Sequence, residues 1–388
     1  MNILKTVKSV ILVLLFVIIF SGVSLADSSN SFYKELKKID VFHPPTDSTR
    51  IPLYNEWHYF NVVDEKQQLS LICVLKLNGA LDASQVLLAC YFNDGSSNTY
   101  FNAYPLSIAQ YSSKTPDVTI NNSSIKLTPE GYSVHIVSED GTRALDALFK
   151  PEAEPSHEFS TPSLPNGGVI KWIVASPKMK VNGKYTLNGK EYTLKNAIGY
   201  HDHNWGYWNW RDLGWDWGQV TESKNSLNGN DIGKYSINFG NITDPDDTQS
   251  FNSDLNLWSD RKVIATFTKK EMRVEHYNFN SQDIPISQVL FLPGNSFPLP
   301  FNTKINVSSR SGDYLNINFT TDFARSSAIP ITIPTLDTNG NMVTEFRIIW
   351  EMRGTYQVNG EIKGKPISFT SNGFMEYVAG DAVLPQVR

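Results

Sequence analysis

One short stretch of the chain concentrates side chains that can transfer protons and sets large aromatic rings between them. Residues 199–220 hold five of the nine tryptophans and two of the seven histidines in the 388-residue sequence. The groups able to transfer protons are His201, Asp202, His203, Asp212 and Asp216, and the single cation is Arg211. In an extended chain successive side chains point to opposite faces, so His201 and His203 share one face and Asp202 takes the other.

These residue types fit acid catalysis on a carbon–carbon double bond. Hydration of an alkene needs a proton donor, a surface that stabilises a carbocation, and a water molecule. A carboxylic acid stays protonated in apolar surroundings because burial raises its pKa by up to several units. Aromatic faces stabilise a desolvated cation by about 2 kcal/mol or more, and a histidine orients the acid or activates the water. Asp202 or Asp216 with His201, His203 and the tryptophans would supply these functions without any cofactor.

Two other interpretations of this stretch stay open. The His-Asp-His cluster could be a hydrogen-bonded structural element that ties one domain to the next, with the tryptophans as core. His201 and His203 could also hold zinc together with a carboxylate from elsewhere in the chain. No third ligand can be identified from the sequence, so the prediction includes no metal site.

The motif resembles the signature of a known family. Gly-Tyr-His-Asp-His-Asn-Trp-Gly at 199–206, followed by Trp-Asp-Trp at 215–217, is similar to that of the hydroxyneurosporene synthase (carotenoid hydratase) and AttH-like proteins. Glu-Trp-His-Tyr-Phe at 56–60 resembles the family's Glu-Trp-Trp-Tyr opening, with His58 in place of the second tryptophan. Residues 373–380 resemble its closing Gly-Tyr-x-Glu-x-x-Gly strand, so the resemblance covers roughly residues 50–388.

The resemblance implies an all-β fold of two tandem lipocalin-like antiparallel β-barrels. It does not fix the activity, because members include hydratases, cyclases and proteins of unknown role. The predicted catalytic residues are His201, Asp202, His203 and Asp216, and the predicted ligand-binding residues are Trp57, Tyr59, Tyr200, Trp205, Arg211, Trp215 and Trp217. Glu376, in the closing strand, is expected to be a structural hydrogen-bond acceptor.

The elements that would position these residues are predicted to be β-strands. Runs such as 272–277 and 315–319 alternate polar and apolar residues with the two-residue period of strands, and 69–77 is also strand-like. A weak internal repeat relates residues 189–200 to residues 364–374. The pattern predicts two homologous β-domains that end in the same hairpin, residues 51–222 and residues 223–388.

The N-terminus has the features of an export signal. Lys5 and Lys8 precede an uninterrupted apolar run over residues 10–20, and small residues at 24 and 26 fit a cleavage site. The prediction is a signal peptide over residues 1–26, followed by a polar N-terminal segment over residues 27–50. Cleavage would release the protein outside the cytoplasm, and an uncleaved leader would hold it at a membrane surface.

The two cysteines lie on neighbouring strand-like runs. In a hairpin centred on the loop between these runs, Cys73 and Cys90 face each other. A cross-strand disulfide and a pair of free buried thiols are both compatible with this arrangement.

The net charge and the absence of several known motifs exclude some classes of partner and enzyme. The 34 lysines and arginines against 39 acidic residues give a net charge of -5 without a basic block, which argues against a nucleic-acid partner. The absence of a Walker loop, a dinucleotide fingerprint and a G-x-S-x-G elbow disfavours nucleotide enzymes and ordinary serine hydrolases. The sequence predicts an exported protein that binds or transforms a hydrophobic, isoprenoid-like molecule, as a cofactor-free hydratase, isomerase or cyclase. The alternatives are a non-catalytic carrier or sensor, and a structural protein whose aromatic stretch is interdomain core.

Overall fold

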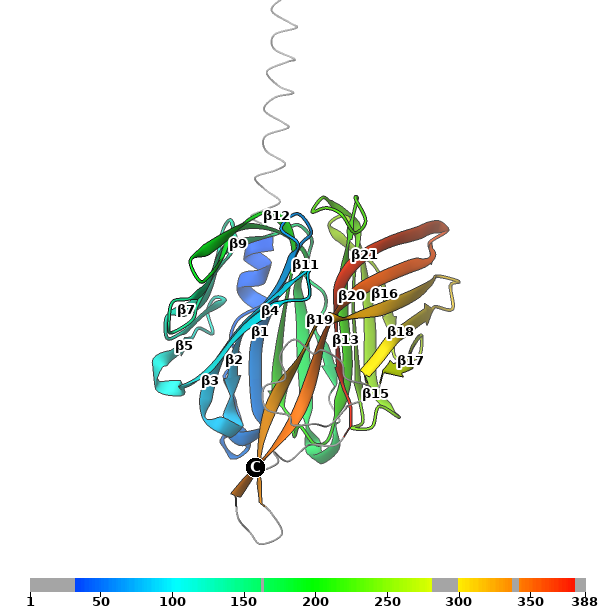
Figure 1. The fold of residues 1–388 in the computed structure, drawn as a ribbon. Coiled ribbons are helices and arrows are strands. Elements are labelled where there is room, and N and C mark those ends of the chain that lie inside the picture. The colour runs from blue at the N-terminus through cyan, green and yellow to red at the C-terminus, as the bar shows by residue number, and fades with distance from the viewer. Residues whose placement is uncertain (1–31, 162–163, 281–298, 337–341, 381–388) are drawn as a thin grey trace, which may run out of the picture.

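The chain folds into two antiparallel β-sheets that lie side by side (Figure 1). The computed structural model describes residues 32–161, 164–280, 299–336 and 342–380. Within these residues the first sheet comprises β1 (Tyr54–Asp64), β2 (Leu69–Asn78), β3 (Ala83–Phe92), β4 (Ser97–Pro105), β5 (Ala109–Tyr111), β6 (Asp117–Ile120), β7 (Ser123–Thr128), β8 (Gly131–Val137), β9 (Arg143–Pro151), β10 (Phe159–Thr161), β11 (Val169–Leu187) and β12 (Lys190–Tyr207). The second comprises β13 (Gly214–Ser223), β14 (Ile232–Thr243), β15 (Ser250–Ser259), β16 (Lys262–Thr268), β17 (Met272–Asn280), β18 (Leu299–Ser308), β19 (Tyr314–Leu336), β20 (Met342–Ile362) and β21 (Lys365–Val378). Short 3₁₀ turns are η1 (Ser48–Leu53), η2 (Gly79–Leu81), η3 (Leu106–Ile108) and η4 (Pro165–Gly167).

The two sheets share one topology. The first runs β4-β3-β2-β1-β12-β11-β9-β8-β7-β6-β5, with β10 beside β11, and the second runs β16-β15-β14-β13-β21-β20-β19-β18-β17. In each sheet a final hairpin folds back so that the last strand pairs with the first, β12 with β1 and β21 with β13. The change of sheet falls between Tyr207 and Gly214, upstream of the predicted boundary at 222/223.

Each sheet curls around its own apolar core, so the all-β prediction is confirmed (Figure 1). Alternate side chains point inward, as the two-residue period requires. Phe60, Leu75 and Ile136 are fully buried in the first core, and Phe239 and Phe319 are fully buried in the second. Burial of such a side chain stabilises the fold by about 1.5–3 kcal/mol.

A third apolar cluster joins the two sheets, and most of the tryptophan-rich stretch belongs to it. Trp208, Trp215 and Trp217 pack there against Ile349 and other residues of the second sheet. The contact is close enough to require glycine at one point: a Cβ on Gly240 of β14 would lie 2.0 Å from Cζ2 of Trp172 on β11.

A short helix over residues 32–39 fills the first barrel (Figure 1). Phe32 and Leu36 belong to the core of this barrel, one helical turn apart on the same face. The chain then places Asp40, which is completely buried, against the inner face of β12. The segment predicted only as polar therefore supplies part of the barrel interior.

The two cysteines are free and buried, one of the two predicted alternatives, but the predicted register that placed them opposite each other is wrong. The hairpin between β2 and β3 turns at residues 79–82, so Cys73 lies opposite Leu88 and Cys90 lies opposite Leu71. The register is shifted from the predicted one by the position of the 3₁₀ turn η2. Burial raises the pKa of both thiols, which keeps them protonated and inert.

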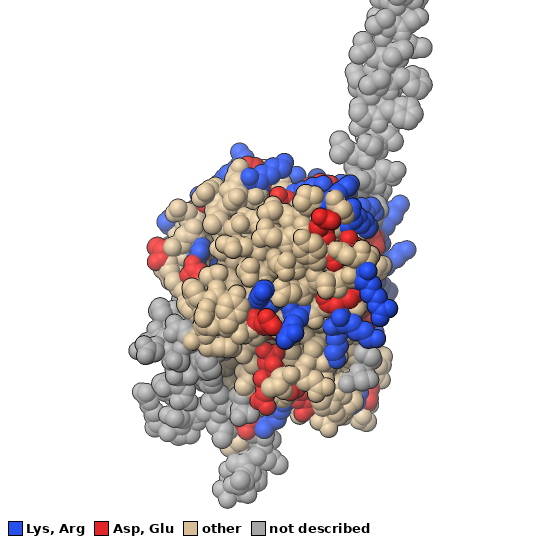
Figure 2. Space-filling view, turned by 90° about the vertical axis from the view of Figure 1, so that its right-hand side faces the viewer, with Lys and Arg blue, Asp and Glu red and all other residues tan. Residues whose placement is uncertain are grey.

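The predicted leader over residues 1–26 lies outside the described residues. No helix in the described ranges has the length and apolar character that crossing a bilayer would demand. Figure 2 shows one face of the molecule, where uncharged residues cover most of the surface and basic side chains lie among acidic ones along one side.

Candidate active site

A pocket opens between the two sheets, where the outer face of β1–β3 meets β19–β21. It has an empty volume of about 650 Å³, part of which is open to solvent. Its lining is mostly aromatic and aliphatic, with a few polar groups: Trp57, Tyr59, Val74, Lys76, Asn78, Gln85, Leu87, Phe101, Trp210, Ile329, Pro330, Ile331, Ile349, Glu351 and Glu376. An apolar pocket with a few converging polar groups is the usual form of a small-molecule site.

A second, smaller pocket adjoins the first. It has an empty volume of about 390 Å³ and shares Trp57, Tyr59 and Glu376 with its neighbour. The remaining lining residues are Ile170, Trp172, Asp202, Asn204, Trp215, Asp216, Trp217 and Ile242. Because the same three side chains line both hollows, we treat the two neighbouring pockets as one candidate site.

Strand alternation decides which side chains reach this site. On β1, Trp57 and Tyr59 face the second sheet while His58 faces the barrel interior. On β12, Asp202 faces the pocket while His201 and His203 point inward. The predicted division of these residues between two faces is confirmed, and it separates the histidines from the pocket.

The duplication explains why acids from both halves meet here. On the first and last strands of the first sheet, Tyr59 lies opposite Asp202. On the corresponding strands of the second sheet, Trp217 lies opposite Glu376. Asp202 and Glu376 therefore occupy equivalent positions of the two repeats, and both point into the space between the sheets.

A pair of carboxyl groups forms the most unusual feature of the pocket. Glu351 on β20 lies opposite Glu376 on β21, and the two buried carboxyl groups interact with each other. Burial raises the pKa of both groups, and the neighbouring Glu376 raises that of Glu351 further. Two adjacent buried carboxyls cannot both ionise, so the pair keeps a proton at neutral pH.

The surroundings place this proton on Glu351. Burial and Glu376 raise the pKa of Glu351 and outweigh the hydrogen bond that Tyr59 Oη donates to its Oε1 at 2.8 Å, which lowers it. Glu376 is better suited to carry the negative charge, since Trp215 Nε1 donates to its Oε2 at 2.7 Å and Lys76 lowers its pKa. Glu351 is therefore the neutral acid of the pair, beside the Glu376 carboxylate.

Asp202 is a third acid at this interface. Burial raises its pKa well above the ordinary value, although hydrogen bonds from Tyr200 Oη at 2.9 Å and Asn204 Nδ2 at 3.0 Å favour its ionised form. Asn238 Nδ2 of the second sheet donates to Tyr200 Oη at 3.0 Å and so fixes the ring. Asp202 is thus held in one orientation at the edge of the smaller pocket.

Lys76 is the cation of the larger pocket. Its Nζ lies 5.1 Å from the centroid of the Trp57 ring and 4.7 Å from that of Trp210. Burial lowers its pKa to about 7, and the attraction of Glu376 opposes the decrease. The amine therefore changes charge near neutral pH while it remains between two aromatic faces.

The structure brings together only part of the predicted site. Trp57, Tyr59, Asp202, Asp216, Trp215 and Trp217 line the pockets, and Tyr200 lies directly behind Asp202. His201, His203 and Trp205 lie inside the first barrel, and Arg211 forms an ion pair with Glu345. Asp216 touches the smaller pocket, but its carboxylate accepts from Asn241 at 2.9 Å and lies 2.9 Å from His276 in the second barrel.

Sequence reasoning missed Glu351 and Lys76, and it assigned Glu376 only a structural role. Glu351 directly follows Ile-Ile-Trp at 348–350, a run similar to Ile-Lys-Trp at 170–172 in the first repeat. Comparison of the repeats position by position would have aligned Asp202 with Glu376 and drawn attention to both acids. Lys76 gave no signal, because a lysine in an alternating strand ordinarily faces solvent.

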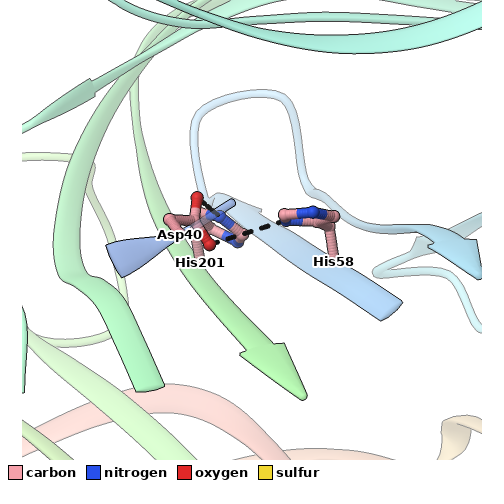
Figure 3. Close-up of side chains that lie close together, drawn as sticks. All are labelled: Asp40, His58 and His201. Atoms are coloured by element: carbon pink, nitrogen blue, oxygen red, sulfur yellow. Dashed lines mark hydrogen bonds and ion pairs between the residues drawn. The ribbon is translucent and has the colours of Figure 1, made fainter. Parts of the chain in front are cut away.

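Three clusters of histidine and carboxylate among the described residues could in principle hold a metal. The first lies in the first barrel and contains Asp40, His58 and His201 (Figure 3). The second adjoins it and contains His43, Glu56 and His203, and the third contains Asp216, Asp247 and His276. None of them includes the Glu351–Glu376 pair.

Comparison with known proteins identifies the fold. No family model and no curated protein sequence matches the chain. Among solved structures it is similar to a putative AttH from Nitrosomonas europaea, with a TM-score of 0.58, 14% identity and coverage of 88% of this chain and 94% of that one. Kievitone hydratase from Nectria haematococca matches with a TM-score of 0.54 and 12% identity over 88% of this chain and 94% of its own. CghA with Sch210972 matches with a TM-score of 0.51 and 10% identity over the same shares.

These similarities extend over nearly the whole of both chains. The two-barrel, lipocalin-like architecture implied by the motif at 199–206 is confirmed, since AttH-like structures share it. Because the identities are 10–14%, the similarity establishes the fold.

Proposed function

We propose that this protein is an enzyme that protonates a carbon–carbon double bond of a neutral, largely apolar small molecule in the pocket between its two sheets. Addition of water, or loss of a different proton, would complete a hydration or an isomerisation. The observation that carries the proposal is the Glu351–Glu376 pair, a carboxyl group held neutral beside a carboxylate in an aromatic pocket. In this proposal the Glu351–Glu376 pair takes the catalytic role that the sequence predicted for His201 and His203.

The geometry supports a complete hydration cycle. The Glu351 carboxyl would transfer its proton to one alkene carbon and leave a carbocation on the other. While Lys76 is neutral, Trp57 and Trp210 offer π faces that stabilise such a cation by about 2 kcal/mol when desolvated. Water would then form the C–O bond and lose its proton to Glu376, and transfer of that proton to Glu351 would restore the pair. General acid–base catalysis of this kind contributes about 10²–10⁴-fold to the rate.

The lining indicates the class of substrate. Aliphatic and aromatic side chains dominate the larger pocket, which favours a hydrophobic, isoprenoid-like body. Lys76, Asn78 and Gln85 lie together on β2 and β3 and would bind an oxygen substituent at one end. Among the structural neighbours, one is named as a hydratase and another is described with a bound small molecule, which supports a small-molecule substrate here.

A carrier would use the same pocket, but the acids favour an enzyme. Burying ionisable groups costs stability, and such groups gather where catalysis needs perturbed pKa values. Asp202, Glu351 and Glu376 all have raised pKa values at one interface. A site that only retained an apolar ligand would gain nothing from these three acids. We further propose export of the protein, on the basis of the predicted leader alone.

Turnover in labelled water tests the proposal. The purified full-length chain would be incubated in H₂¹⁸O with linear and cyclic isoprenoid alkenes and with any molecule extracted from the native protein. We expect an ¹⁸O-labelled alcohol or a shifted double bond from the wild type, and at least a 100-fold lower rate from Glu351→Gln with ligand affinity retained. Glu361→Gln, an exposed change on the same strand, is the matched control. Ligand recovered unchanged and unlabelled from the wild type would favour the carrier.

A further inference from the structure

A second polar cluster lies on the other face of β1 and β12, inside the first barrel (Figure 3). Asp40 reaches it from the segment after the N-terminal helix, His58 from β1, and His201 and His203 from β12. These four side chains are between 0% and 2% exposed. None of them lines either of the pockets between the sheets described above.

The polar atoms of this cluster converge on one carboxylate. Asp40 Oδ1 lies 3.0 Å from His203 Nδ1 and 3.6 Å from His58 Nδ1, and Asp40 Oδ2 lies 2.9 Å from His201 Nε2. Nevertheless, Asp40 Oδ1, His58 Nδ1 and His203 Nδ1 make no hydrogen bond of acceptable geometry. Asp40 Oδ1 thus lies 3.0 and 3.6 Å from two buried ring nitrogens without a well-formed hydrogen bond, an arrangement that folded proteins rarely leave unexplained.

The outer nitrogens of two rings show which atoms are available as ligands. His201 Nδ1 lies 2.9 Å from the carbonyl oxygen of Tyr59, which only accepts, so this nitrogen carries the proton. His203 Nε2 lies 2.9 Å from Glu56 Oε1 and donates in the same way. The inner nitrogens, His201 Nε2 and His203 Nδ1, face the Asp40 carboxylate, and a metal ion bound there would take the place of any proton on them. Metal-binding histidines are oriented by this kind of outer hydrogen bond to a carbonyl or carboxylate.

We propose that this cluster binds one divalent transition-metal ion of the Zn²⁺ class, with Asp40, His58 Nδ1, His201 Nε2 and His203 Nδ1 as ligands. Zn–N and Zn–O bonds of about 2.1 Å at tetrahedral angles place neighbouring ligand atoms about 3.4 Å apart. The separations of 3.0 and 3.6 Å from Asp40 Oδ1 bracket this value. One dication among these groups would also compensate the two buried carboxylates, Asp40 and Glu56.

Four protein ligands make this a closed site, which is the form of a structural metal centre. The ion would fasten the N-terminal segment to β1 and β12, far along the chain from Asp40. The sequence alone indicated His201 and His203 as possible zinc ligands but did not show which carboxylate could join them. In the structure, Asp40 is that carboxylate. The inference does not depend on the proposed catalytic function, because the site and the pocket lie on opposite faces of the same two strands.

Metal analysis of the full-length chain tests this site. The protein would be purified without chelator and without a polyhistidine tag, equilibrated with Zn²⁺, dialysed, and analysed for bound metal. We expect about one ion per chain and a lower melting temperature after removal of the ion. The double variant His58→Gln/His201→Gln should lose at least about 10-fold in bound ion, and His276→Gln, a matched change at the cluster of the second barrel, should retain it.

Co²⁺ titration of the unchanged chain gives a second measurement in case the double variant does not fold. A closed four-coordinate nitrogen–oxygen site should produce visible absorption bands that Zn²⁺ removes. Absence of these bands, or less than about a tenth of an ion per chain after equilibration, would overturn the proposal. Retention of the ion by a folded double variant, or its loss from His276→Gln, would also overturn it.

Discussion

Replacement of Glu351 by glutamine should make the stability of the protein less dependent on pH. Glutamine has nearly the shape of a protonated glutamic acid, so it can occupy the place opposite Glu376 without ionising. In the unfolded chain the glutamate titrates near its ordinary pKa of 4.5, and in the folded chain burial and Glu376 hold its pKa well above that value. The folded state therefore retains a proton that the unfolded state has already lost.

The sign and size of the effect follow from proton linkage. Below pH 4.5 both states are protonated and Glu351 adds no pH dependence. Above that value the folded state binds more protons than the unfolded one, so the free energy of unfolding falls by about 1.4 kcal/mol per pH unit until the folded pKa is passed. The variant lacks this decrease. We expect Glu351→Gln to match the wild type near pH 4 and to be more stable than the wild type at pH 7 and 8.

Urea denaturation between pH 4 and 8 measures this difference. Glu361→Gln, on the exposed part of the same strand, is the control and should follow the wild type throughout. If Glu351→Gln and the wild type lost stability in parallel as the pH rose, the carboxyl pair would hold no extra proton, and the reasoning would fail.

Three further predictions concern other parts of the fold. Lys76→Met should raise the melting temperature more at pH 6 than at pH 9. The lysine has a pKa of about 7 in the folded protein and an ordinary pKa of 10.5 in the unfolded chain. Its burial therefore lowers the free energy of unfolding by the full amount below pH 7, and this cost declines as the pH rises toward 10.5. Gly240→Ala should destabilise the protein by about 1–3 kcal/mol in chemical denaturation, because the new methyl group would overlap the Trp172 ring. Cys73 and Cys90 should react with a thiol reagent only after unfolding, and a folded chain that released two equivalents at once would contradict their burial.

Local patterns were enough to predict much of the fold. The two-residue period placed His201 and His203 on one face of a strand and Asp202 on the other, and the structure confirms this division. The weak repeat at 189–200 and 364–374 falls on the last hairpin of each sheet. Such features can be read from the sequence because strand alternation and hairpin turns depend on neighbouring residues.

The contacts that define the two sites depend on distant parts of the chain. Glu351 meets Tyr59 of the other sheet, and Asp40 meets His201 from a segment without periodicity. The predicted pairing register of β2 with β3, which placed Cys73 opposite Cys90, was wrong because the sequence did not show where the 3₁₀ turn between the two strands begins. The His-Asp-His motif drew attention to residues that the fold divides between a barrel interior and an interdomain pocket.

Infrared spectroscopy of the carboxyl groups tests the central claim most directly. A difference spectrum between the wild type and Glu351→Gln at pH 7 isolates the protonation state of this one side chain. Our account predicts a band of a neutral carboxylic acid that is present in the wild type, shifts in D₂O and is missing from the variant. A spectrum in which Glu351 contributed only carboxylate bands at pH 7 would leave the pocket without its proton donor and would contradict the account.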